Sequence, residues 1–380
     1  MSGAPAPQAR VSVVISCFNY VRFVAPAVAS ALDQRGCEVE VVVVDDGSSD
    51  GSVEALGTFG DRIRVLEKPN EGQGSALSAG YAASRGDVLI FLDADDLLLE
   101  GAALSSARAL SDTSVSKAHW SMPVVDAEGD PTGELLDPDL VEGDLRRHVA
   151  AEGPLSERVL PSPPMSGNAF SRWFLDRVMP VPALYRLRAD DYLSGLAPAF
   201  GAIVRLAPQS LYRMHGANLH LAQDFEQIYG FEQSHYELVA RIVAETYARD
   251  GVPHELSAWD RFSWAKRLAR TVRAITEAVP AGERLALIDE GLLGVTGELS
   301  GRGVIAFGER DGEWGGSPVS DEAALAELER LRAASVRYIA LAWPAFWWLE
   351  EYPRLAAALG DCRRLPVGED AVLIFGPADA

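Results

Sequence analysis

Short β-branched runs alternate with segments of helical periodicity over the first hundred residues. The apolar runs are VSVVIS at 11–16, VEVVVV at 39–44, RIRVL at 62–66 and DVLIFL at 87–92. Helical spacing fills the intervals at 21–32, 50–56 and 73–84. Strands that alternate with helices in this way form a parallel sheet covered by its crossover helices. The pattern therefore predicts an α/β half of the nucleotide-binding type.

The pattern loosens after residue 96. It predicts a helix near 101–110, a hairpin over 117–125 with a turn at 126–133, and irregular structure in the proline-rich stretch 154–164. Two long helices follow, at 224–249 and 258–278, and an α/β rhythm returns from 304 to 375. We expect four parts: a disordered tail at 1–10, a first domain at 11–222, a helical appendage at 223–300 and a small α/β domain at 301–380.

Composition restricts the partners and the compartment. A net charge of −21 repels nucleic acid and anionic bilayers, so neither is expected as the main partner. Three scattered cysteines suit a reducing compartment better than a disulfide framework. The N-terminus has no signal-peptide h-region, and no apolar run is long enough for an integral span. We expect a cytoplasmic protein, either free or peripheral to the inner membrane face.

Two acidic turns carry the strongest chemical signal. LDADD at 92–96 follows an apolar strand, which places Asp93 and Asp95 at its carboxyl end, where open α/β sheets bind ligands. Such carboxylates suit Mg²⁺ or Mn²⁺ together with phosphate oxygens. A turn with a helix N-cap is the alternative. The second acidic turn, at Asp45 and Asp46, ends a nearby strand and favours a shared ligand crevice.

Four stretches in chain order resemble family 2 of the glycosyltransferases: SVVISCFNY at 12–20, VVVDDGSSDGS at 42–52, NEG at 70–72 and FLDADD at 91–96. The resemblance implies a GT-A fold, in which a Rossmann-like nucleotide-binding half and an acceptor-binding half share a mixed central sheet. The full predicted architecture is this α/β fold followed by the helical segment and the small C-terminal α/β domain described above.

The resemblance also implies a set of donor-binding positions. Asp46 would accept a hydrogen bond from the nucleobase, Asp93 would hold ribose or sugar hydroxyls, and Asp95 would bind the metal, with Asp93 as a further metal ligand. SGNAF at 166–170 would lie under the transferred sugar, although a helix N-cap ahead of Trp173 is equally open. The remaining donor-binding positions are Ser16, Asn19, Asp45, Asn70, Gly72, Ala94, Ser166, Gly167 and Asn168.

Two later motifs complete the implied site. Asp190 and Asp191 match the acidic pair that carries the general base, with Asp191 at the base position and Asp190 where the family usually shows Glu. In LYRMHGANLH at 211–220, His215 would complete the metal shell, with His220 as its substitute, and Arg213 would contact the diphosphate. A carboxylate within hydrogen-bond reach of the acceptor hydroxyl can remove its proton in a single inverting displacement.

These features together predict an inverting glycosyltransferase that depends on Mn²⁺ or Mg²⁺. The donor would be a UDP-, GDP- or dTDP-sugar, and the acceptor a glycan, lipid or small molecule in surface polysaccharide, glycolipid or metabolite glycosylation. Assembly as a homo-oligomer stays open. The alternatives are a non-catalytic sugar-nucleotide-binding subunit and a sugar nucleotidyltransferase; an oxidoreductase is disfavoured because no G-x-G-x-x-G follows the first strand.

Overall fold

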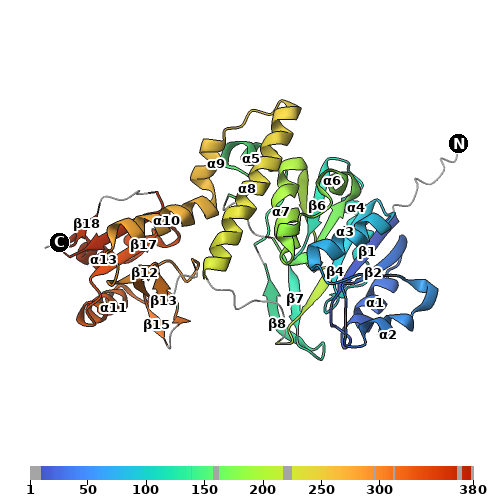
Figure 1. Ribbon diagram of the computed structural model, residues 1–380, viewed down its shortest axis with the longest axis horizontal. Helices are drawn as coiled ribbons and strands as arrows, with labels where there is room; N and C mark the ends of the chain where they lie inside the picture. The colour runs from blue at the N-terminus through green and yellow to red at the C-terminus, as the bar shows by residue number, and fades with distance from the viewer. Residues whose placement is uncertain are drawn as a thin grey trace. The chain divides into compact units, whose positions relative to one another are not determined.

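The structure is a computed structural model that describes residues 10–137, 139–156, 162–216, 225–293, 297–310, 313–365 and 370–377 (Figure 1). The predicted tail at 1–10 lies outside this part, except for Arg10. The chain divides into two compact units, one formed by residues 1–221 and 234–262, the other by residues 222–233 and 263–380. The division falls within helix α8 (Phe225–Asp250).

The first unit is built on a seven-stranded sheet in the order β10-β6-β9-β4-β1-β2-β3. The strands in this order are Ala202–Arg205, Val115–His119, Asn168–Ser171, Val88–Asp93, Arg10–Cys17, Glu38–Asp45 and Arg64–Glu67. Strands β3, β2, β1 and β4 pair in parallel, whereas β9 runs antiparallel to both β4 and β6. The predicted α/β class with a mixed central sheet is confirmed.

Helices cover this sheet because its inner strands are apolar on both faces. Val88, Leu89, Ile90, Phe91 and Leu92 of β4 are all buried, as expected of a parallel strand between two helical layers. Besides α8, the helices of this unit are α1 (Val24–Leu32), α2 (Ser52–Gly57), α3 (Gln73–Ala83), α4 (Ala102–Ala109), α5 (Arg146–Glu152), α6 (Arg172–Val178), α7 (Ala189–Phe200) and α9 (Leu256–Phe262). Of these, α1, α3, α4, α6 and α7 contact strands of the sheet. A Cβ at Gly80 of α3 would lie 2.2 Å from Val14 Cγ1, so glycine allows this helix to approach β1 closely.

A second sheet corrects the predicted hairpin at 117–125. The chain leaves the central sheet after β6, and β7 (Met122–Val125) joins a four-stranded sheet in the order β5-β11-β7-β8. Its other strands are β5 (Leu97–Leu98), β11 (Ser210–Arg213) and β8 (Pro131–Leu136). Trp120 and Ser121 lie between the two sheets, and Trp120 is fully buried and donates its indole N–H to Ser210 Oγ at 2.7 Å. The hairpin is therefore β7–β8.

The second unit contains a six-stranded sheet in the order β13-β14-β12-β17-β19-β18. These strands are Gly297–Leu299, Arg302–Ala306, Arg284–Ile288, Tyr338–Ala342, Val372–Gly376 and Arg363–Arg364. The other elements are α10 (Trp264–Ala278), α11 (Asp321–Ala333), α12 (Trp348–Glu351), α13 (Pro353–Gly360) and the hairpin β15 (Glu309–Arg310)–β16 (Glu313–Trp314).

The second unit begins earlier than the expected start at residue 301. Strand β12 lies in the middle of its sheet, and α10 belongs to it as well, since Thr271 Oγ1 donates to the Ala371 carbonyl at 3.3 Å. Side-chain caps start two of its helices, because Ser263 Oγ accepts from Lys266 N–H and Ser320 Oγ from Ala323 N–H. None of the described helices combines the length and apolarity that crossing a membrane requires.

Candidate active site

A cavity of about 430 Å³ opens in the first unit where the strands β1, β2 and β4 end. The pairing register places Ser16 beside Asp93, and the cavity is lined by residues from both acidic turns. Predicted site residues that line it are Ser16, Asp46, Asn70, Gly72, Asp93, Ala94, Asp95 and Asp190. The shared crevice expected from the sequence is therefore present.

Asp93 lies at the end of β4, and one oxygen of its carboxylate accepts two side-chain hydrogen bonds. Its Oδ1 accepts from Gln73 Nε2 at 3.1 Å and from Ser16 Oγ at 3.3 Å. Burial is the main cause that raises the pKa of Asp93 to about 7, and the charges of Asp95 and Asp190 add to it. Burial, followed by the charges of Asp95 and Asp93, raises the pKa of Asp96 as well. The described side chains thus do not balance the negative charge of these neighbouring carboxylates.

Asp95 and His215 meet at the same end of the sheet. His215 Nε2 lies 3.0 Å from Asp95 Oδ2, and the two side chains are only 4% and 10% exposed. The imidazole stacks on the Phe23 ring, with centroids 4.6 Å apart, and meets the edge of Tyr20. The structure brings together the two residues that the resemblance assigned to the metal, although they are separated by 119 intervening residues in the sequence. His220 lies outside the described residues.

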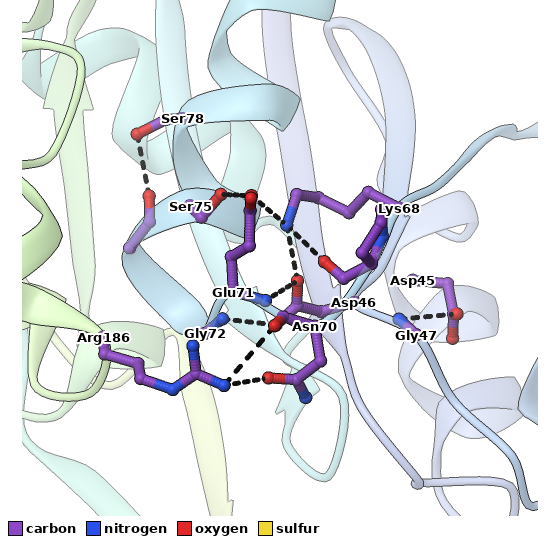
Figure 2. Close-up of polar contacts among 12 residues, drawn as sticks. Asp45, Asp46, Gly47, Lys68, Asn70, Glu71, Gly72, Ser75, Ser78 and Arg186 are labelled. Atoms are coloured by element: carbon purple, nitrogen blue, oxygen red, sulfur yellow. Dashed lines mark hydrogen bonds and ion pairs between the residues drawn. The ribbon is translucent and has the colours of Figure 1, made fainter.

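The loop that precedes α3 is held by Asp46 (Figure 2). Asp46 Oδ1 accepts from Lys68 Nζ at 2.7 Å and from the Glu71 N–H at 3.1 Å, while Oδ2 accepts from the Gly72 N–H at 2.7 Å. Asp46 still lines the cavity, but its carboxylate already has these three donors. Its local role is to fix the glycine-rich turn against the end of β2.

The acidic pair begins helix α7. Asp190 lines the cavity, and burial raises its pKa. Asp191 is not among the lining residues, and its Oδ2 lies 2.7 Å from Arg188 Nε. The two carboxylates therefore face different surroundings, one in the cavity with Asp93 and one beside a guanidinium.

Eight predicted residues do not line the cavity, and Asp191 and His215 are two of them. Asn19 joins two loops, since its Oδ1 accepts from the Ser49 N–H, and Asp45 accepts from the N–H groups of Gly47 and Ser48. Asn168 donates to the carbonyls of Pro163 and Pro164, and Ser166 Oγ accepts from the Asp93 N–H. The others are Gly167 and Arg213. The resemblance placed Ser166, Gly167 and Asn168 under the transferred sugar. The neighbouring Pro164 and Met165 line the cavity instead of these three residues.

Arg213 also has contacts other than those expected. Its Nε donates to the Asp95 carbonyl at 2.9 Å and its Nη1 to the Ala127 carbonyl at 3.1 Å, while the guanidinium lies over the Phe23 ring. Its backbone N–H donates to Asp96 Oδ1. Buried in this position, Arg213 supports the acidic turn from behind.

Two cations in the cavity wall escaped the sequence analysis. Arg186 and Arg188 line the cavity and precede the acidic pair, in the stretch RLRADD. Arg186 Nη2 donates to Asn70 Oδ1 at 2.5 Å, as Figure 2 shows. The sequence signal that could have identified them is their position just before the acidic pair. Gln73, Tyr20 and Tyr212 also line the cavity. Both tyrosines lie within motifs quoted above, at 12–20 and 211–220, but were not predicted as site residues.

A buried lysine lies behind α7. Lys117 on β6 is 3% exposed, and its Nζ donates to Ser162 Oγ at 2.8 Å and to Ser194 Oγ at 2.9 Å. Burial lowers the pKa of Lys117 to about 7, against the opposing attraction of Asp190 and Asp137. The folded state thus binds fewer protons at Lys117 than the unfolded state between about pH 7 and the ordinary value of 10.5.

Replacing Lys117 with methionine is expected to stabilise the protein most at and below about pH 7, where the wild type must bury a charged amine. The wild type's free energy of unfolding should rise relative to that of Lys117→Met as the pH increases from about 7 towards 10.5. Thermal unfolding of both proteins over this pH range measures the difference. A difference in melting temperature that does not change with pH would contradict the lowered pKa.

Comparison with known proteins places the chain in a family. A family model described as Glycosyl transferase family 2 matches residues 12–117. The chain is 32% identical over 234 residues to the uncharacterized glycosyltransferase alr2836 of Nostoc sp. (strain PCC 7120), which covers 56% of this chain and 67% of that relative. It is 35% identical over 91 residues to the chondroitin synthase of Pasteurella multocida, covering 23% of this chain and 9% of the synthase.

Among solved structures, S. aureus TarS 1-349 in complex with UDP aligns with a TM-score of 0.45 and 17% identity, covering 70% of this chain and 73% of that chain. The assignment rests on the sequence comparisons. Because the family model covers the strands and the acidic turns that form the cavity, and because two thirds of a glycosyltransferase align at 32% identity, this protein is a glycosyltransferase that belongs to family 2.

Proposed function

We propose that this enzyme transfers a sugar, with inversion, from a nucleoside-diphosphate sugar to an acceptor hydroxyl and that it requires Mn²⁺ or Mg²⁺. The observation that carries the proposal is the convergence of Asp46, Asp93 and Asp95 on one cavity together with Asp190, the first acid of the pair that begins α7. A donor site and a candidate base thus share one space, as a direct displacement requires. Family membership already disfavours the nucleotidyltransferase alternative.

The cavity supports an anionic donor in spite of the protein's net charge of −21. Its volume of about 430 Å³ falls in the range of small-molecule sites. The N-terminus of α3 and its preceding turn, Asn70–Gly72, border it, and helix N-termini favour phosphate. Arg186 and Arg188 add positive charge to the wall. We propose that the diphosphate lies between these groups and the acidic turn at 93–96.

The residues around Asp95 fit a divalent cation. A carboxylate oxygen and an imidazole nitrogen lie 3.0 Å apart in a buried place, a donor pair that suits Mn²⁺, and Asp93 adds a carboxylate nearby. Within the described residues, no three His, Cys, Asp or Glu side chains form a complete metal site. Asp95 and His215 would therefore hold the ion jointly with diphosphate oxygens and water. The ion would neutralise charge on the leaving diphosphate.

For the base we propose Asp191, which matches the family position. Its carboxylate would take the proton of the acceptor hydroxyl while the bond between the anomeric carbon and the diphosphate breaks. Arg188, which pairs with Asp191 at 2.7 Å, holds that carboxylate at the start of α7. Asp190 is the alternative, supported by its place in the cavity wall. The acceptor class of glycan, lipid or small molecule is proposed from the resemblance alone.

Thermal unfolding with a panel of nucleoside diphosphates tests the donor site. One member of a UDP, GDP and dTDP panel is expected to raise the melting temperature in the presence of Mn²⁺, and to do so less without it, because a ligand that binds only the folded state stabilises it. At about one hundred times its Kd, the ligand adds about 2.7 kcal/mol. If no diphosphate raises the melting temperature with or without metal, the proposed donor site is wrong.

A further inference from the structure

Gln73, the first residue of α3, connects two parts of the site. Its Nε2 donates to Asp93 Oδ1 at 3.1 Å, and its Oε1 accepts from the backbone N–H of Ala189 at 3.2 Å. Its own backbone N–H donates to the Arg186 carbonyl at 2.7 Å. One amide side chain therefore bridges the donor-side carboxylate and the first residue of α7.

Helix α7 depends on this contact at its N-terminus. The first N–H groups of a helix have no partner within the helix and need an acceptor. The residue at the N-cap, Arg188, makes no side-chain cap bond and has a φ of 61°, whereas Gln73 accepts from Ala189. A residue of another helix thus supplies the cap. The next two residues along α7 are the acidic pair, so this cap sets where their backbone begins.

A second contact ties the same two segments together. Arg186 Nη2 donates to Asn70 Oδ1 at 2.5 Å and also lies 3.4 Å from the Asn70 carbonyl (Figure 2). Gly72 has a φ of 92°, and a Cβ there would lie 2.3 Å from the Arg186 carbonyl oxygen. The turn before α3 and the segment before α7 are therefore in direct backbone contact, with no room for a larger residue between them.

We propose that Gln73 is a positioning residue that couples donor binding at Asp93 to the position of the acidic pair on α7. The inference rests on the proposed function. Only a side chain with both a donor and an acceptor can make the two bonds at once, and the glutamine amide has both. A donor that fixes Asp93 then also fixes, through Gln73, the start of α7, from which the base must reach the acceptor hydroxyl.

The first experiment compares Gln73→Met with a matched control, Gln34→Met. Gln34 also caps another helix, since its Oε1 accepts from the Ala103 N–H at 3.0 Å, and its Nε2 donates to the carbonyls of Leu99 at 2.9 Å and Ser30 at 3.1 Å. It is not among the residues that line the cavity. Each substitution therefore removes an amide that caps a helix and donates to a further group, inside the site for Gln73 and outside it for Gln34.

Gln73→Met is expected to lower kcat by about 100-fold, because a small misplacement of a reacting group has an effect of this size. Its Kd for the nucleoside diphosphate with Mn²⁺, measured by titration calorimetry, should stay within about threefold of the wild type, since Ser16 still donates to Asp93. The rate of hydrogen exchange at the backbone amides (amide exchange) should increase at the start of α7. Gln34→Met should change neither kcat nor exchange at α7.

Gln73→Glu separates the two bonds. Its carboxylate can still accept from Ala189 but cannot donate to Asp93, so amide exchange at α7 should match the wild type. Unlike methionine, glutamate also adds a negative charge beside Asp93 and the diphosphate, and this repulsion should lower the diphosphate affinity. The inference is overturned if Gln73→Met keeps the kcat of Gln34→Met, or if its amide exchange at α7 equals that of the wild type. If the wild type transfers no sugar, the proposed function fails, yet the exchange measurement still decides whether Gln73 holds α7.

Discussion

Asp95→Asn is expected to remove the metal dependence of diphosphate binding and to lower kcat/KM by roughly 10²- to 10³-fold, the size of effect seen when a charge-stabilising group is removed. Asparagine keeps the shape of the side chain but loses the anionic oxygen that lies 3.0 Å from His215 Nε2. A neutral amide binds a divalent cation more weakly than a carboxylate. The difference in melting temperature with and without Mn²⁺, and steady-state kinetics, measure the two effects.

A matched control for this variant is Asp61→Asn. Asp61 is exposed and is not among the residues that line the cavity, so the same change of charge there should leave binding and transfer unchanged. His215→Ala should reproduce the loss caused by Asp95→Asn, because the two side chains form one buried pair. Metal-dependent diphosphate binding that persists in both variants would show that the ion is held elsewhere.

Asp191→Asn is expected to bind the donor as the wild type does and to lower kcat by roughly 10²- to 10⁴-fold, the contribution typical of a general base. An amide cannot accept the proton of the acceptor hydroxyl, whereas donor contacts at Asp93 and Asn70 are untouched. Titration with the nucleoside diphosphate and Mn²⁺ measures binding, and initial rates at saturating donor and acceptor measure kcat.

The neighbouring acid provides the comparison. Asp190→Asn should change the donor affinity more than Asp191→Asn does, because only Asp190 lines the cavity. It should lower kcat less. The reverse ranking, with near-normal turnover in Asp191→Asn and almost none in Asp190→Asn, would transfer the role of base to Asp190.

The sequence predicted the parts of the fold that depend on local pattern. Strands predicted at 11–16, 39–44 and 87–92 are present as β1, β2 and β4, because buried parallel strands read as continuous apolar runs. Strands β1 and β2 are each two residues longer than predicted, and β4 is shifted by one residue. The hairpin at 117–125 was wrong for a non-local reason. Two adjacent strands belong to different sheets, and the two residues between them, Trp120 and Ser121, are buried like the strands and do not mark a break in the local sequence.

The candidate site was predictable where side chains lie at strand ends, as with Asp46, Asp93 and Asp95. The site was not predictable where a motif residue makes its hydrogen bonds within its own loop, as Asn168 does to the carbonyls of Pro163 and Pro164. Arg186 and Gln73 are 113 residues apart in the sequence, and both lie at the cavity because their segments contact each other. No local sequence pattern records such a contact.

The division within helix α8 has a practical consequence for truncation. The later part of α8 and α9 belong to the first unit, where His235 Nδ1 lies 2.7 Å from Tyr185 Oη and Trp259 Nε1 donates to the Ala150 carbonyl. Tyr185 adjoins Arg186 of the cavity wall. A fragment cut after the last family motif, near residue 222, would lack the histidine behind that wall. The smallest fragment with an intact catalytic unit therefore extends to residue 262.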